Sequence, residues 1–194
     1  MSSTNIETRE KILKAAWTLL EAGHAARVRM SDIARHAGIS RQALYLHFPT
    51  RAELLVATAR YVDDVKNVEE RLAASRAAAT GVERLNAFIE AWGNYIPEIY
   101  GIAQAFLAMQ DTDEAAALAW NDRMQAMRQG CAAAVRALNK DGELSPAQSP
   151  KQATDLLWTL LSVGNWENLR QTCGWSQKRY IDTMKRIAKS VLVE

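Results

Sequence analysis

Apolar residues recur every three or four positions along almost the whole chain, which is the spacing of the buried side of an α-helix. No stretch alternates apolar and polar residues as a half-buried strand does, and no internal repeat is visible. The pattern predicts an all-α protein of about nine helices.

Capping signals divide this pattern into helices. A residue that can cap a helix N-terminus is followed three positions later by Glu or Gln at several points, which predicts helix starts there. These pairs are Thr4 with Glu7, Thr50 with Glu53, Thr80 with Glu83, Asp111 with Glu114, and Ser149 with Gln152. A last helix is expected to open at Ser176.

Two stretches predict a particular helix geometry. From Arg51 through Leu72 there is neither Gly nor Pro, and none occurs before Gly81, so we expect one long connecting helix. Pro97 is expected to stop or kink the helix that starts near Thr80 and to begin the next one.

The stretch from Ser31 to Glu53 predicts a helix-turn-helix. Ile33, Ala34 and Leu44 contribute to the apolar side of two short helices, and Gly38 lies between them, where a left-handed cap would turn the chain. Ser40 can cap the second helix. That helix would present these polar side chains away from the core: Arg41, Gln42, Tyr45 and His47.

Two of these side chains suit DNA base recognition. The guanidinium of Arg41 matches guanine O6 and N7, and the amide of Gln42 matches adenine N6 and N7. A solvated helix face is the alternative for both, and a buried helical hairpin without a DNA role is the alternative for the whole motif. Arg51 would lie in the first turn of the next helix, where the dipole disfavours a cation, so a nearby phosphate would fit.

Charge is unevenly distributed along the 194 residues, although the formal net charge is only +2. Residues 1–60 hold nine Lys or Arg against five Asp or Glu, and the remainder holds 15 against 17. All three histidines also lie in the first part. A locally basic module is what a phosphate-contacting protein needs.

These residues resemble the DNA-binding signature of the tetracycline-repressor (TetR) family of transcriptional regulators. The similarity covers the first quarter to third of the chain, although Arg29 replaces a common threonine and the loop from Gly23 to Met30 is one residue longer. The matching positions are Thr8-Arg9, Ile12-Leu13, Ala15-Ala16, Asp32-Ile33-Ala34, Ala37-Gly38-Ile39-Ser40, Leu44-Tyr45, His47-Phe48, Arg51 and Leu54.

The resemblance implies a three-helix DNA-binding domain over residues 1–50 and a helical effector-binding and dimerisation domain over 51–194. It also implies a homodimer on a roughly palindromic double-stranded operator. Phosphate contacts are implied for Ser31, Ser40, Tyr45, His47 and Arg51, and Arg29 is a further candidate.

Aromatic and methionine side chains gather in the second part of the chain. On each predicted helix these side chains are three or four positions apart, so core packing explains most of them individually. Together they also suit a largely apolar ligand pocket, which the resemblance places between the middle helices. The candidates are Trp92, Tyr95, Phe106, Trp120, Met124, Met127 and Trp158.

The last two long helices carry more apolar surface than one subunit's core should absorb, which predicts a dimer interface. The resemblance describes it as a four-helix bundle. The candidate residues are Leu157, Leu161, Gly164, Ile181, Met184 and Ala188.

Other functions have little support in the sequence. No catalytic or phosphate-binding motif is present, and two distant cysteines predict neither a disulfide framework nor a metal site. We therefore expect no enzyme activity, no cofactor, no membrane span and a cytoplasmic location. Cys131 is expected to be an inert core residue, with an oxidation sensor as the alternative.

We interpret the chain as a ligand-responsive regulator, most simply a repressor released from its operator by an apolar or aromatic effector. The alternative is a DNA-binding regulator without a small-molecule effector, whose body serves dimerisation or a protein partner. A helical enzyme is a remote third possibility.

Overall fold

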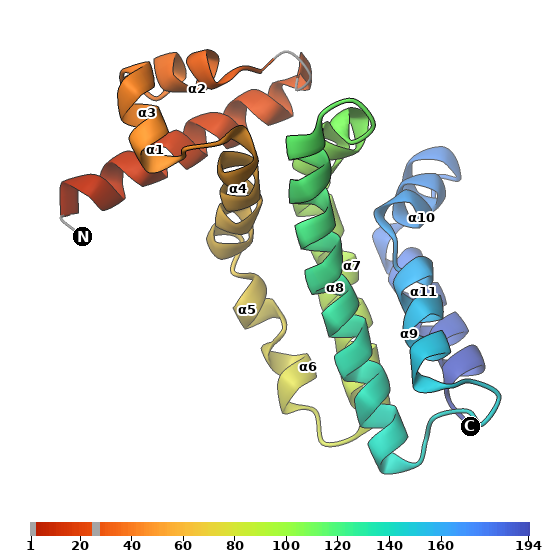
Figure 1. Ribbon diagram of the computed structural model, residues 1–194. Helices are drawn as coiled ribbons and strands as arrows, with labels where there is room; N and C mark the ends of the chain where they lie inside the picture. Colours follow the sequence, from red (N-terminus) through yellow and green to blue (C-terminus); the bar gives the residue numbers. More distant parts are fainter. Residues whose placement is uncertain (1–2, 25–27) are drawn as a thin grey trace. The chain divides into compact units, whose positions relative to one another are not determined.

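The computed structural model describes residues 3–24 and 28–194, and the regular elements there are helices apart from one isolated bridge between Leu144 and Val193 (Figure 1). This confirms the all-α prediction. The α-helices are α1 (Ser3–Leu19), α2 (Met30–His36), α3 (Arg41–His47), α4 (Arg51–Val65), α5 (Val68–Arg71), α6 (Ala73–Ala77), α7 (Gly81–Met109), α8 (Glu114–Asp141), α9 (Pro150–Leu160), α10 (Val163–Glu167) and α11 (Gln177–Leu192). Two short π-helical segments, Leu20–His24 and Asn168–Thr172, follow α1 and α10.

The described residues form two compact units. The first comprises the chain up to Lys66 together with Ile99–Met124, and the second comprises Asn67–Glu98 and Gln125–Glu194. Helices α7 and α8 therefore contribute to both units. The predicted boundary at residue 50 is a functional division, and it stays a prediction.

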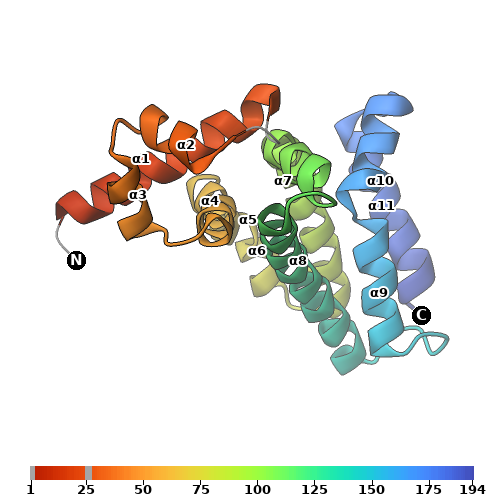
Figure 2. The ribbon, with the colours of Figure 1, turned by 45° about the horizontal axis from the view of Figure 1, so that its top comes forward.

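In the first unit, α2 and α3 pack on α1 around an apolar core, and α4 also lies against α1 (Figure 2). Ile12 and Ala16 of α1, Ile33 of α2 and Leu44 of α3 are completely buried in this core. Burial of one apolar side of each short helix against α1 is what stabilises them, because helices of seven residues are not stable alone.

The stretch from Arg51 to Gly81 is not the single long helix that we expected. Helix α4 ends at Val65, and Asn67 has a left-handed backbone with φ of +53°. Asparagine adopts this conformation more readily than most residues, and it cannot continue a right-handed helix. Two short helices, α5 and α6, follow instead.

Of the two expectations for Pro97, the stop is wrong, because α7 runs through the proline, and the kink stays a prediction. Proline cannot donate a hydrogen bond to the carbonyl four residues earlier, which belongs to Gly93. The side chain of Gln177 in α11 donates to that carbonyl instead, with Nε2 at 2.6 Å from the oxygen. A partner from another helix therefore satisfies the group that the proline leaves unpaired.

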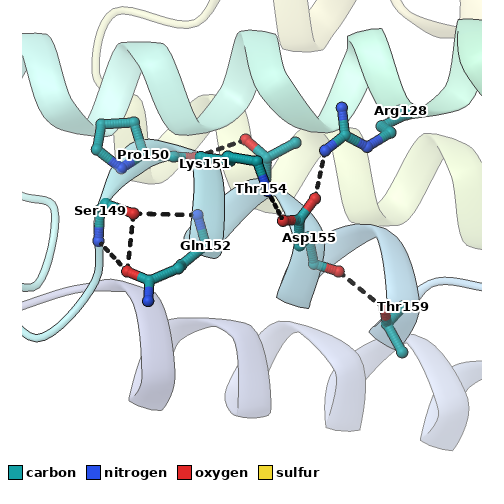
Figure 3. A network of polar contacts seen from close by, with 8 residues as sticks. All are labelled: Arg128, Ser149, Pro150, Lys151, Gln152, Thr154, Asp155 and Thr159. Carbon is teal, nitrogen blue, oxygen red and sulfur yellow. Dashed lines mark hydrogen bonds and ion pairs between the residues drawn. The ribbon is translucent and has the colours of Figure 1, made fainter.

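In the second unit, the start of α9 has the capping box that the sequence predicts (Figure 3). The Ser149 hydroxyl accepts the backbone N–H of Gln152 at 3.3 Å, and the Gln152 side chain accepts the backbone N–H of Ser149 at 3.0 Å. One turn later, Asp155 pairs with Lys151 of the same helix and with Arg128 of α8. The cap fixes where α9 begins, and the ion pairs link it to α8.

Other predicted helix ends have mixed outcomes. The Thr80–Glu83 cap at α7 is confirmed, as is Ser176 at α11. Asp113 rather than Asp111 caps α8, since its carboxylate accepts the N–H groups of residues 115 and 116. Thr4 lies inside α1, and the helix predicted to start at Ser149 ends at Leu160.

Candidate nucleic-acid interface

Helices α2 and α3 form a helix-turn-helix with the geometry that the sequence predicts. Gly38 has φ of +70°, the left-handed conformation that a C-terminal cap requires. The N–H of Ile39 donates to the carbonyl of Ala34 at 3.0 Å, which closes the end of α2. The hydroxyl of Ser40 accepts the N–H of Ala43 at 3.0 Å and caps α3. The turn is therefore fixed from both sides.

The face of α3 opposite the core is exposed and carries the predicted base-reading residues. Leu44 and the following Phe48 are buried, whereas Arg41 and Gln42 are exposed. The Arg41 guanidinium lies 5.5 Å from the centre of the Tyr45 ring, so a cation–π contact orients both side chains on this face. The side chains of Arg41, Gln42 and Tyr45 on this face are therefore accessible from outside the protein.

Leu46 also lies on this face, and the sequence reasoning missed it. Its side chain is 81% exposed, more than that of any other large apolar residue that the structure describes. A leucine two positions after the buried Leu44 falls off the apolar side of a helix, so its position relative to the helical period could have identified it.

The predicted phosphate contacts occupy different environments. Ser31 and Arg29 are exposed at the start of α2, and the backbone N–H of Arg29 donates to Asp32 at 3.1 Å. His47 is partly buried at the end of α3. The hydroxyl of Ser40 already accepts one hydrogen bond, but it can still donate one. Part of the loop from Gly23 to Met30 lies outside the described residues.

Arg51 is bound within the protein. Its Nε donates to the Asp113 carboxylate at 3.0 Å, and its guanidinium also donates to the carbonyl of Val28 at 2.7 Å. Only 23% of the side chain is exposed. The anion expected beside this cation at the α4 N-terminus is thus supplied by a carboxylate of the chain itself. A phosphate contact by Arg51 stays a prediction, and it would compete with Asp113.

Two further ion pairs join α4 to α8 within the first unit. Arg60 donates two hydrogen bonds to Asp122, at 2.6 and 3.1 Å. These hydrogen bonds lower the pKa of the Asp122 carboxyl. One turn further along α4, Asp63 is buried and pairs with Arg123. The pair of Arg51 with Asp113, the residue that caps α8, also holds α4, and we call the three the α4–α8 ion pairs.

The aromatic and methionine residues predicted to bind a ligand come from three helices rather than four, because α7 is continuous. Phe106, Trp120 and Met124 belong to the first unit, and the other four belong to the second. Within the second unit, Trp92 and Tyr95 lie with ring centres 6.1 Å apart. The Trp92 indole donates to the carbonyl of Leu161 at 2.7 Å, which attaches α7 to the end of α9.

The residues predicted for a dimer interface are mostly internal to one chain. Five of the six are buried by the protein's own side chains, and Gly164 alone among the six is exposed. The buried five are Leu157, Leu161, Ile181, Met184 and Ala188. The exposed large apolar side chains of the same two helices are Leu156 of α9 and Val191 of α11, and the dimer interface itself stays a prediction.

Within the described ranges, no group of three or more His, Cys, Asp or Glu side chains is arranged to hold a metal ion. In the same ranges, no helix is both long enough and apolar enough to cross a membrane.

Comparison with known proteins finds one family model that matches the N-terminal part of the chain. Residues 12–58 match the family model described as "Bacterial regulatory proteins, tetR family". A nucleoid occlusion factor SlmA from Marinomonas sp. is 31% identical over 64 residues, which are 33% of this chain and 32% of that protein. The SlmA of Idiomarina loihiensis is 25% identical over 111 residues, which are 57% and 49% of the two chains. The matched segments thus span a third to a half of these curated relatives.

Solved structures match nearly the whole chain. A candidate transcriptional regulator from Saccharomonospora viridis, crystallised with choline, has a TM-score of 0.73 and 22% identity, covering 97% of this chain and 98% of its own. NalD, the secondary repressor of the MexAB-OprM multidrug efflux pump in Pseudomonas aeruginosa, has a TM-score of 0.72 and 22% identity, covering 98% of each chain. At this identity the likeness concerns the fold.

Proposed function

We propose that the chain is a homodimeric transcriptional repressor of the TetR family that binds a palindromic DNA operator and leaves it when a small molecule binds. The match of residues 12–58 to the tetR family model supports this proposal. One observation carries the DNA-binding part of this proposal. The capped helix α3 buries Leu44 in the module's core and presents Arg41, Gln42 and Tyr45 on one open face.

Recovery of DNA sequences from a randomised duplex pool tests this part. The protein should select an operator with two related half-sites, and its affinity should fall steeply with salt, because phosphate contacts release counterions. Arg41→Ala should cost about 1–3 kcal/mol on that operator and relax the preference at one position in each half-site. Lys140→Ala, which removes an exposed cation of α8 far along the sequence, is the matched control. Equal losses in both variants would contradict a base-reading role for Arg41.

The effector part of the proposal rests on the aromatic side chains of the body. In the second unit, Trp92, Tyr95, Met127 and Trp158 supply the large apolar surfaces that a ligand pocket needs, and Phe106, Trp120 and Met124 in the first unit stay candidates. Aromatic faces also bind quaternary ammonium groups. Choline, which is bound in the Saccharomonospora viridis structure, is therefore the first compound to test.

A ligand titration read by tryptophan fluorescence and by operator binding tests the effector. An effector should change the fluorescence and lower operator affinity by about 1–3 kcal/mol, a typical coupling between two sites. Trp120→Ala and Trp158→Ala compare one candidate from each unit. A true ligand residue should lose the response and keep the DNA affinity of the free protein. Loss of DNA binding and thermal stability together would make that tryptophan an ordinary core residue.

A regulator without a small-molecule effector is the second candidate function. The matches to the nucleoid occlusion factor SlmA favour it, and one of them extends over 57% of the chain. In that case the body would serve dimerisation or a protein partner. A protein that binds its operator tightly while no compound in a broad apolar and cationic set changes its fluorescence would support this candidate over the first.

A further inference from the structure

Leu46 is an apolar side chain on the exposed face of α3 that also carries Arg41 and Gln42. It occupies the last turn of α3 and is 81% exposed, although Leu44 and Phe48 on either side of it are buried. No packing within the first unit accounts for a leucine at this position. A single exposed leucine needs no explanation by itself. Leu46 is informative because it shares the exposed face of α3 with Arg41, Gln42 and Tyr45.

Helix geometry places Leu46 beside Gln42. Residues four apart lie next to each other on a helix surface, so Gln42 with Leu46 and Arg41 with Tyr45 form two adjacent rows. The Arg41–Tyr45 cation–π contact shows that one of these rows is ordered as a pair. Leu46 therefore extends the surface that the guanidinium and the amide begin.

The charge around this face favours DNA as the occupant. The first 60 residues hold nine cations against five anions, and Arg41 lies on the face itself. Within the major groove, the 5-methyl group of thymine is the apolar group that a base pair presents, and aliphatic side chains contact it. A leucine beside an arginine and a glutamine matches a groove that offers one methyl group among hydrogen-bonding atoms.

We propose that Leu46 is a specificity-determining residue that contacts the 5-methyl group of one thymine in each half-site, next to the base pair that Gln42 reads. This proposal rests on the DNA-binding function proposed above. It assigns to α3 an apolar recognition contact in addition to the hydrogen-bonding contacts of Arg41 and Gln42.

Replacement of thymidine by deoxyuridine tests this contact, because their bases, thymine and uracil, differ only in the 5-methyl group. Each thymine of the selected operator is replaced in turn, and the affinities of the wild type and of Leu46→Ala are measured. The wild type should lose about fourfold in affinity per half-site at one thymine position, the factor expected for burying one methyl group. Leu46→Ala should bind the unmodified operator more weakly and should not respond to deoxyuridine at that position.

The control for this test is a leucine variant outside α3. Leu118→Ala removes a half-exposed leucine of α8 and should respond to every deoxyuridine as the wild type does. Equal responses of the wild type and Leu46→Ala at all thymines would overturn the methyl contact. A change in sedimentation of Leu46→Ala with unchanged operator affinity would also overturn it and would assign the leucine to a protein contact. If the wild type selects no sequence from the pool, the DNA-binding proposal itself fails, which is a separate result.

Discussion

At the scale of single residues, Arg51 shows how a cation at a helix N-terminus can be stabilised from within the protein. The dipole of α4 disfavours a positive charge at that end, and Asp113 offsets this with a carboxylate at 2.9 Å. The pair is about three-quarters buried on both sides, so solvent screens it less than an exposed pair. Sequence separation hides the pairing, because the two partners are 62 positions apart.

We expect Arg51→Ala and Asp113→Ala each to lower the free energy of unfolding by about 1–2 kcal/mol, between the values for exposed and buried pairs. The double variant should lose less than the sum of the two single losses, because the shared ion pair is removed only once. The Asp113 cap of α8 and the Arg51 bond to the Val28 carbonyl are lost separately. Urea denaturation measures all three variants. Additive losses would contradict the pairing. A salt dependence of DNA binding that falls by about one unit in Arg51→Ala alone would show that this arginine also contacts a phosphate.

The two cysteines differ in their surroundings and should differ in reactivity. Burial raises the pKa of the Cys131 thiol to about 12, and its Sγ lies 3.8 Å from the Sδ of Met127. Cys173 is exposed. The thiolate is the reactive form, so Cys131 remains protonated and unreactive at neutral pH.

A coloured thiol reagent at pH 8 should therefore modify one thiol in the native protein and the second only in denaturant. Cys173→Ser should remove the fast reaction, and Cys131→Ala should leave it unchanged. Fast modification of Cys131 in native Cys173→Ser would contradict its burial and would revive the oxidation-sensor alternative.

At the scale of elements, α7 shows that a proline signal depends on its tertiary context. Pro97 would end or kink an isolated helix, because it leaves the carbonyl of Gly93 without a partner. The Gln177 side chain supplies that partner and also accepts the indole N–H of Trp166 at 3.2 Å. The residues near Pro97 in the sequence do not predict this contact, because Gln177 lies 80 positions later.

Gln177→Ala should destabilise the protein by about 1–3 kcal/mol, because it leaves a buried carbonyl without its hydrogen bond. The same change should cost less in a Pro97→Ala background, where the new backbone N–H can reach the Gly93 carbonyl. Thermal or urea unfolding of the four proteins gives the coupling energy between the two positions. Equal costs of Gln177→Ala in both backgrounds would show that the proline and the glutamine act independently.

At the scale of the whole molecule, the helix-turn-helix was predictable and the body was less so. Ser40 and Thr50 cap α3 and α4 as predicted, and Gly38 is left-handed, because short-range chemistry determines these features. The continuity through Pro97 depends on a contact with a residue far along the sequence, and the break at Asn67 occurs without a Gly or Pro to mark it. The large number of apolar residues likewise indicated that α9 and α11 bury a large surface. It could not show whether that surface packs in the chain's own core or against a second subunit.

If the protein is a dimer, substitutions of two leucines in α9 should have different effects. Leu161→Asp would place a charge in a fully buried site and should unfold the protein, with loss of helical circular dichroism. Leu156→Asp changes an exposed side chain, so it should leave the fold intact and yield monomers in sedimentation. Operator affinity should then collapse, because half-sites about 34–36 Å apart need two linked DNA-binding modules. A folded Leu156→Asp that sediments as the wild type does would exclude Leu156 from the interface.

The α4–α8 ion pairs also determine where this chain can be recombined with a protein of the same fold. A chimaera that borrows only residues 1–50 from a relative keeps Arg51, Arg60 and Asp63 together with their partners in α8. A junction after Lys66 would instead import a foreign α4 and leave Asp113, Asp122 and Arg123 facing unmatched side chains. Exchange of DNA specificity should therefore succeed with the earlier junction, or with the later one only if positions 113, 122 and 123 are exchanged as well.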